Sequence, residues 1–107
     1  MKILMLILLL NLGSVQSVEV GPDQALTVIS AGTGDPVVLL PGLSGCAYGY
    51  RKILPPLHDL GYRTLIVEPL GMGSSPRPRH ADYTLTAQAD RVAAVLDTLQ
   101  VGPAVVV

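Results

Sequence analysis

The stretch that decides the fold is Pro36–Gly45, with the sequence Pro-Val-Val-Leu-Leu-Pro-Gly-Leu-Ser-Gly. Its four consecutive apolar residues, Val37 to Leu40, run into a Pro-Gly turn, which is typical of a strand that is buried on both faces of a sheet. A strand that ends in a glycine-containing loop before a helix places backbone N–H groups at the carboxyl end of the sheet, where open α/β folds bind ligands. The stretch therefore predicts an α/β fold with a ligand site at the loop Pro41–Gly45.

The residues on both sides of this stretch predict further strands and helices. Val18–Val20 and Ala25–Ile29 indicate a β-hairpin, because the turn residues Gly21-Pro22-Asp23 lie between them. Further along the chain we expect a loose turn to about Leu54, followed by a short helix that starts at Pro55-Pro56 and ends at Gly61. A strand should then run over Tyr62–Val67. After it we expect a helix from Leu85 to about Gln100, with Thr84 as its N-cap, and a buried strand over Ala104–Val107.

The predicted order is a β-hairpin followed by β-α-β-α-β. Strands that alternate with helices favour parallel pairing with right-handed crossovers. We therefore expect parallel core strands with flanking helices, in one domain whose sheet is incomplete. The long helix should face the core with its apolar residues Leu85, Ala89, Val92, Ala93, Leu96 and Leu99.

The first residues have the pattern of a cleaved signal peptide. Met1-Lys2 is a short positive start, and Ile3–Leu10 is an unbroken apolar run. Val15 and Ser17 suit the positions before a signal-peptidase site. The apolar run is about half of the roughly 20 residues that span a bilayer, so an uncleaved membrane anchor is the less favoured alternative. The sequence thus predicts residues 1–17 as a signal peptide, cleavage after Ser17, and a secreted or periplasmic protein.

Composition limits the partners of the chain. The net charge is −1 with His neutral, only 14% of the residues are charged, and no basic patch exists, which argues against nucleic acid as a partner. Membrane contact is expected only through the leader, if it is uncleaved. A mature chain of about 90 residues is near the lower size limit for a single domain with its own core.

Cysteine and glycine motifs predict no metal and no cofactor. Cys46 is the only cysteine, so export rests on the leader, and this thiol is expected to be a small buried hydrophobe, with a reactive thiol as the alternative. No Cys/His set has metal-ligand spacing. Gly71-Met72-Gly73 lacks the third glycine of a dinucleotide-binding motif, and Gly42–Gly45 lacks the Lys-Ser/Thr of a phosphate-binding loop.

Taken in order, the motifs resemble the α/β-hydrolase fold family over roughly Ser17 to Val107. Pro36–Gly45 resembles the third strand and oxyanion loop of that family, and Leu54–Glu68 resembles its first helix, the following turn and the next strand. Glu68–Ser75 is similar to the family's Asp-x-x-Gly-x-Gly-x-Ser loop, and Tyr83–Val101 resembles the helix that precedes the nucleophile strand. Each motif is weak alone, but the ordered set at these spacings is fairly specific.

The resemblance implies acyl transfer by an activated nucleophile, with backbone N–H groups that stabilise the oxyanion. By position, the N–H of Leu43 becomes one oxyanion donor. Gly42, Ser44 and Gly45 become the substrate-binding candidates, because Gly42 permits the turn and Gly45 leaves room for substrate. The alternative is that Pro41–Gly45 is only a turn between a strand and a helix.

Three positions depart from the family pattern. Pro41 replaces the usual His, Glu68 replaces the usual Asp, and Leu70 replaces a frequent Arg. The first change removes a side chain that often supports the oxyanion loop. The other two predict altered hydrogen bonding within the second loop.

The nucleophile of the family lies on a Gly-x-Ser-x-Gly turn directly after the fifth strand. That strand begins here at Ala104, and the sequence given ends at Val107, so no complete catalytic triad can be placed. His58 and His80 come too early in the chain to be favoured as catalytic bases. A rival placement makes Ser44 the nucleophile, since Gly42–Cys46 is one residue away from the same motif, although no suitable Asp and His follow it.

The resemblance therefore implies the N-terminal part of an exported hydrolase, with carboxylic esters as the favoured substrates and no activity in the 107-residue chain alone. Two alternatives remain: a non-catalytic truncated product or small exported interaction module, and a hydrolase with Ser44 as its nucleophile. The particular small-molecule substrate is open, and so is the nucleophile, because epoxide hydrolases and dehalogenases of this family use Asp in place of Ser.

Overall fold

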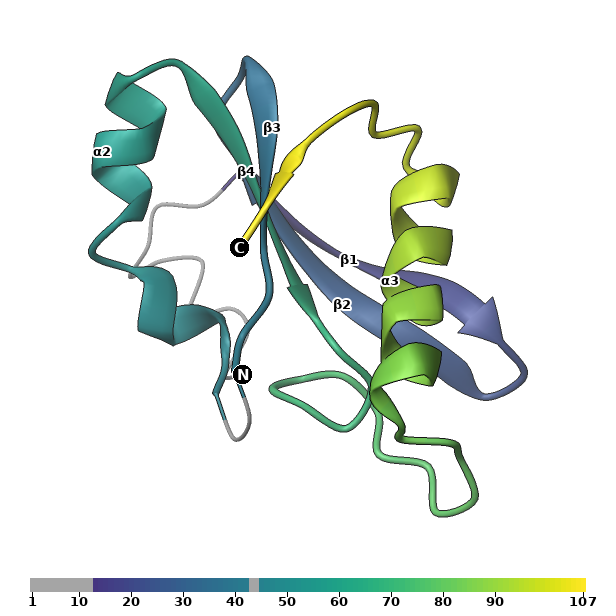
Figure 1. The fold of residues 1–107 in the computed structure, drawn as a ribbon. Helices are drawn as coiled ribbons and strands as arrows, with labels where there is room; N and C mark the ends of the chain where they lie inside the picture. Colours follow the sequence, from purple (N-terminus) through teal and green to yellow (C-terminus); the bar gives the residue numbers. More distant parts are fainter. Residues whose placement is uncertain (1–12, 43–44) are drawn as a thin grey trace.

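The structure is a computed structural model that describes residues 13–42 and 45–107. This part of the chain forms one five-stranded sheet with helices on both faces (Figure 1). The elements in chain order are β1 (Ser14–Gly21), β2 (Gln24–Ala31), β3 (Asp35–Leu39), the 3₁₀ helix η1 (Ala47–Tyr50), α2 (Leu54–Asp59), β4 (Tyr62–Glu68), α3 (Leu85–Thr98) and β5 (Val105–Val106).

The strands lie in the order β1-β2-β4-β3-β5. β1 and β2 form an antiparallel hairpin, and β2 pairs antiparallel with β4. β3 lies between β4 and β5 and is parallel to both of them. The predicted α/β class, the hairpin and the parallel core strands with flanking helices are confirmed.

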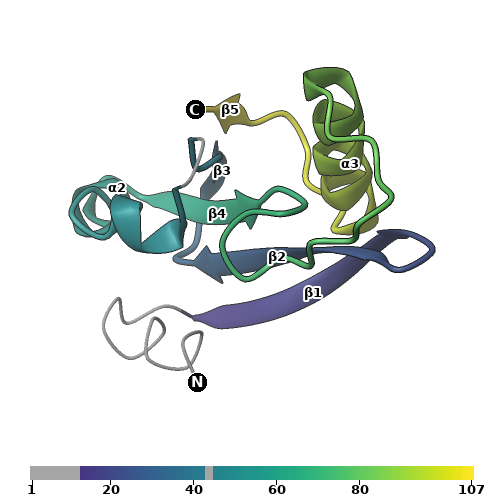
Figure 2. The same ribbon diagram turned by 90° about the horizontal axis from the view of Figure 1, so that it is seen from below.

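Two apolar clusters cover the two faces of the sheet, because successive side chains of a strand point to opposite faces. On one face, Val28, Val38 and Leu65 pack with α3. On the other face, Ile29, Leu39 and the neighbouring strand residues pack with η1 and α2. Figure 2 shows the sheet from below, with α3 and α2 on different sides of it. Burial on both faces explains why the core strands are continuous apolar runs.

Local signals place the ends of the helices where the sequence predicts them. Proline occupies the first turn of α2, where a missing N–H costs nothing, and Gly61 follows that helix with φ +88°. The Oγ1 of Thr84 accepts a hydrogen bond from the N–H of Ala87 at 3.2 Å, which makes Thr84 the N-cap of α3.

The hairpin and the last strand differ from their predictions. β1 begins at Ser14, upstream of the predicted Val18–Val20, because Val15 packs against the η1 side of the core and Ser14 bonds to Ser30. The predicted burial of Ala104–Val107 is wrong, since Val105 and Val106 are 61% and 54% exposed. β5 pairs only with β3, so its outer edge has no neighbour among the described residues.

The predicted core face of the long helix is partly wrong. Leu85 is 89% exposed, and Ala89 and Ala93 are also exposed. The side of α3 that meets the sheet contains Val92, Leu96 and Leu99 as predicted, and also the buried residues Arg91 and Val95. Arg91 is buried because its polar head is occupied: its Nε donates to Gln24 Oε1 at 3.0 Å and its Nη1 to Gln88 Oε1 at 3.1 Å.

Within residues 13–42 and 45–107, no helix is long and apolar enough to cross a membrane.

Candidate active-site loops

Two loops leave the sheet at the edge where the parallel strands β3 and β4 end. The first runs from Leu40 to Ala47 and is called the β3 loop below. The second runs from Glu68 to Ser75 and is called the β4 loop. Since parallel strands end at the same edge of a sheet, the topology brings the two loops together, and ligands of open α/β sheets bind at this edge.

The β3 loop contains the residues that the sequence marks as an oxyanion site. Pro41 is buried and Gly42 is exposed. The N–H of Gly45 donates to the carbonyl of Gly42 at 2.8 Å, which closes a tight turn. Leu43 and Ser44 lie outside the described residues, so the oxyanion role of Leu43 and the substrate-binding role of Ser44 stay predictions. Gly42 and Gly45 lie within the described residues, but their substrate-binding roles also stay predictions.

Tyr50 holds the beginning of the β3 loop. Its hydroxyl donates to the carbonyl oxygen of Leu40 at 2.5 Å. Burial raises the pKa of this phenol above its ordinary value, so the hydroxyl stays protonated at neutral pH and remains a donor. Tyr50 belongs to η1, the element that directly follows the loop.

Glu68 holds the end of the same loop. This residue closes β4, and its carboxylate is buried, with 2% of the residue exposed. Oε2 accepts the N–H of Ala47 at 3.0 Å. Oε1 accepts the N–H of Ser74 at 3.0 Å and the hydroxyl of Ser74 at 2.6 Å. One carboxylate thus connects the β3 loop to the β4 loop. Glu68, which stands where the family usually has Asp, makes these hydrogen bonds of the β4 loop itself.

The β4 loop is shaped around this carboxylate. A Cβ on Gly73, whose φ is +55°, would lie 2.0 Å from Oε2 of Glu68, so only glycine fits there. Ser75 is buried; its hydroxyl donates to the Glu68 carbonyl at 2.6 Å and accepts the N–H of Thr27 at 2.9 Å. The loop is therefore tied to the neighbouring strand β2.

β5 ends beside the β3 loop. The N–H of Val107 donates to the carbonyl of Val38, and the N–H of Leu40 donates to the carbonyl of Val107, both at 2.9 Å. The last residue of the sequence given is thus paired with the residue that opens the β3 loop.

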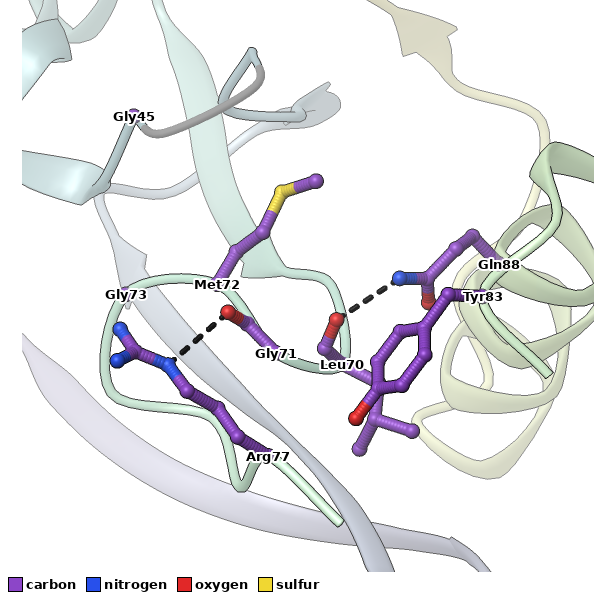
Figure 3. Close-up of a pocket in the computed structure, with 8 residues that line it drawn as sticks. All are labelled: Gly45, Leu70, Gly71, Met72, Gly73, Arg77, Tyr83 and Gln88. Carbon is purple, nitrogen blue, oxygen red and sulfur yellow. Dashed lines mark hydrogen bonds between the residues drawn. The ribbon is translucent and has the colours of Figure 1, made fainter. Parts of the chain in front are cut away.

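An open pocket of about 650 Å³ lies between the two loops and the start of α3 (Figure 3). In the figure, the side chain of Met72 extends away from the β4 loop, while Tyr83 stands beside Leu70. Gln88 donates to the carbonyl of Leu70 at 2.8 Å, and Arg77 donates to the carbonyl of Gly71 at 3.1 Å. The lining residues are Gly45, Leu70, Gly71, Met72, Gly73, Arg77, Tyr83 and Gln88.

Other candidate groups do not join this edge. His58 bonds through Nε2 to Thr64 Oγ1 at 2.9 Å, near the amino end of β4, and His80 is exposed in the segment before α3. Cys46 is exposed, so its predicted burial is wrong; it lies in the turn just before η1, where its side chain meets solvent. In the described ranges, no three His, Cys, Asp or Glu side chains gather into a possible metal site.

Sequence reasoning missed the connecting roles of Glu68 and Tyr50. In the sequence, Glu68 is marked only as a departure from the family motif, and no motif includes Tyr50. The available signal was the combination of a glutamate at a strand end with Gly73-Ser74-Ser75 a few residues later. That pattern offers hydroxyl and N–H donors to a carboxylate, but it does not identify Ala47, which lies 21 residues away.

Comparison with known proteins places this geometry in a family. A family model described as "alpha/beta hydrolase fold" matches residues 35–107, well over half of the chain. A haloalkane dehalogenase of Mycobacterium marinum is 39% identical over 72 residues, which cover 66% of this chain and 24% of that protein. Lipase 3 of a Moraxella species is 38% identical over 60 residues, which cover 56% and 18% of the two chains.

The fold agrees with these matches. The crystal structure of an epoxide hydrolase from Vigna radiata superposes with a TM-score of 0.81 at 26% identity, over 91% of this chain and 32% of that chain. The chain spans about a quarter or less of the length of the dehalogenase and the lipase. With the family model, the relatives and the superposition in agreement, the chain belongs to the α/β-hydrolase fold family.

Proposed function

We propose that this chain forms the N-terminal part of an exported hydrolase that cleaves carboxylic esters through a nucleophile–His–acid triad. In this proposal the β3 loop contributes one oxyanion donor, the N–H of Leu43. The second donor, the nucleophile and the base come from residues that follow Val107. The substrate is a small molecule, and the chemistry requires no cofactor.

One observation carries the proposal: the pairing of Val107 with Leu40 and Val38. Because β5 runs parallel to β3, a chain that continues past Val107 leaves the sheet beside the β3 loop. A nucleophile on a sharp turn after that strand would lie near the loop N–H groups, as acyl transfer requires. The lipase relative supports ester substrates, and the dehalogenase relative supports a carbon–halogen bond as the alternative.

The first test is the coding sequence beyond the Val107 codon. A continuing frame with Gly-x-Ser-x-Gly within a few residues supports the proposal. An Asp at the central position of that motif would instead favour a haloalkane or an epoxide as the substrate. A genuine stop codon, together with a soluble monomeric product, would favour the non-catalytic interaction module.

The second test is hydrolysis. The complete gene product should hydrolyse p-nitrophenyl butyrate with saturation, whereas the 107-residue chain alone should not. Saturable activity of the 107-residue chain that Ser44→Ala abolishes would overturn the placement and make Ser44 the nucleophile. Halide release from a chloroalkane, without ester hydrolysis, would exclude ester chemistry.

Export is a separate part of the proposal and has its own test. The predicted cleavage after Ser17 falls within β1. A mature chain from Val18 loses the pairs of Ser14–Ser17 with β2 and keeps the pairs of Val18 with Leu26 and of Glu19 with Ala25. Expression with the native leader should therefore yield an exported protein whose N-terminal sequence begins at Val18. Retention of the leader on a cell-associated protein would contradict export by cleavage.

A further inference from the structure

We infer that Glu68 is a positioning residue for the β3 loop: its buried carboxylate sets where the loop ends and therefore where the oxyanion donor lies. This inference rests on the proposed function, because it assigns a role within the same site. It concerns a residue that acts through the loop and does not touch the reacting atoms.

The first step is the hydrogen-bond acceptor that η1 needs. The first N–H groups of a helical turn have no partner within the helix and need an acceptor from elsewhere. Cys46, the N-cap residue of η1, provides no side-chain hydrogen bond. Ala47 is fully buried, and its N–H is satisfied by Oε2 of Glu68 at 3.0 Å. Glu68 thus takes the place of a local N-cap, although it lies on β4.

The second step is the rigidity of the carboxylate. Its other oxygen is held by the N–H and hydroxyl of Ser74, and its backbone carbonyl is held by the hydroxyl of Ser75. The carboxylate also lies against Gly73, where an added Cβ would be only 2.0 Å from Oε2. Hydrogen bonds to an ionised carboxylate are roughly twice as strong as those between neutral groups. The carboxylate is therefore a fixed point on a central strand.

The third step connects this fixed point to catalysis. The tether at Ala47 lies a few residues after Leu43, and the Tyr50 hydroxyl holds the other end of the loop at Leu40. Side chains of β4 and η1 therefore hold the two described ends of the loop. A displacement of about 1 Å in a catalytic group can cost about 100-fold in rate. Loss of the Glu68 tether should therefore reduce turnover more than substrate binding.

The experiment uses the complete gene product and the variant Glu68→Gln. Its amide has only one acceptor oxygen, so the N–H of Ala47 or of Ser74 loses its partner. We expect kcat for p-nitrophenyl butyrate to fall between about 10-fold and 100-fold, with KM within about threefold of the parent. Hydrogen exchange of residues 45–50 should become faster, while exchange of β3 and β4 stays close to that of the parent.

Thr64→Val is the matched control. Thr64 is fully buried on the same strand and bonds to His58 and to the Ala31 carbonyl, but it lies near the amino end of β4. This variant should lower the unfolding temperature without reducing kcat. An unchanged kcat in Glu68→Gln, or equal losses of kcat in both variants, would show that Glu68 has a structural role only and would overturn the inference.

Two further measurements apply if Glu68→Gln does not fold or if the parent protein is inactive. If Glu68→Gln does not fold, Ser74→Ala replaces it, because Ser74 is exposed and its hydroxyl makes the 2.6 Å bond to the carboxylate. Its kcat and the exchange of residues 45–50 must then change in the same directions by smaller factors. If the parent hydrolyses no substrate, the proposed function fails, and the exchange measurement alone decides whether Glu68 positions the loop.

Discussion

The β3 loop and the β4 loop leave the same edge of the sheet, but they are held in different ways. The β4 loop is held by its own backbone: Met72 donates to Pro69, Ser75 to Met72, and Gly71 to Pro76, at 2.8–2.9 Å. The described part of the β3 loop has one backbone bond within the loop, from Gly45 to Gly42; its other backbone bonds join Leu40 to Val107 and Gly49 to Cys46. Its other tethers come from Tyr50 and Glu68. One end of the β3 loop is thus bonded to a residue of the β4 loop, which has several backbone bonds of its own.

This difference predicts that substitutions in the β4 loop destabilise the protein more than substitutions that remove a tether of the β3 loop. The predictions below test it from the largest expected effect to the smallest.

Gly73→Ala should be the most damaging change. The new Cβ would displace the Glu68 carboxylate, and alanine is strained at φ +55°. We expect a loss of about 3 kcal/mol in the free energy of unfolding, measured by urea denaturation. The control is Gly49→Ala, where a Cβ meets nothing within 4 Å, and its effect should stay below about 0.5 kcal/mol. Equal losses in the two variants would contradict the packing of Glu68 against Gly73.

Ser75→Ala should cost about 2 kcal/mol, because the buried N–H of Thr27 would lose its acceptor. Thermal unfolding followed by circular dichroism measures the change. Ser30→Ala removes a hydroxyl whose hydrogen-bond partner Ser14 is exposed and precedes the predicted cleavage site, so it should cost far less. A smaller effect at Ser75 than at Ser30 would show that the β4 loop does not depend on its tie to β2.

Tyr50→Phe should have a smaller effect, about 1 kcal/mol, because only the bond to the Leu40 carbonyl is lost and the site is partly accessible to water. In the parent protein, a spectroscopic titration should show the Tyr50 phenol ionising above its ordinary pKa, and this signal should disappear in the variant. Tyr48→Phe, at an exposed ring, is the control. Persistence of the signal in Tyr50→Phe would show that another tyrosine is responsible.

Asp82 should give the smallest effect, and only in acid. Hydrogen bonds from the backbone N–H and then the side chain of Thr84, together with the charge of Arg91, lower the pKa of Asp82 below 3.8. A lowered folded-state pKa stabilises the protein above the unfolded value, and this contribution is lost as the pH falls through the folded value. Acid unfolding of Asp82→Asn should therefore show a shallower pH dependence below about pH 4. Superimposable acid-unfolding curves would contradict this assignment.

Most of the fold was predictable from the sequence because its signals are local. The prolines at the start of α2, the cap at Thr84 and the apolar runs of β3 and β4 depend on near neighbours. The predictions are wrong for residues whose burial depends on contacts with distant parts of the chain. Leu85 is apolar but points away from the sheet, and Arg91 is buried because Gln24 of the distant hairpin accepts its hydrogen bond.

The candidate site was predictable in outline only. The sequence indicates the loop from Pro41 to Gly45, because proline and glycine directly after an apolar run form a local sequence pattern. It did not identify what holds that loop, because the tether joins Glu68 to Ala47 across β4 and η1. A carboxylate at a strand end has the same appearance in a sequence whether it is solvated or buried among N–H groups.

The position of β4 between β2 and β3 has a consequence for synthesis of the chain. The β1–β2 hairpin pairs residues that are close in the sequence, but its inner edge has no partner until β4 is synthesised, after β3 and α2. The bond from Arg91 to Gln24 joins residues 67 positions apart and must form later still. Until then the nascent chain exposes an apolar strand edge of the kind that recruits other chains. A translational pause between β3 and β4 would lengthen that exposure, and the yield of folded protein would then depend on chaperone capture of the hairpin.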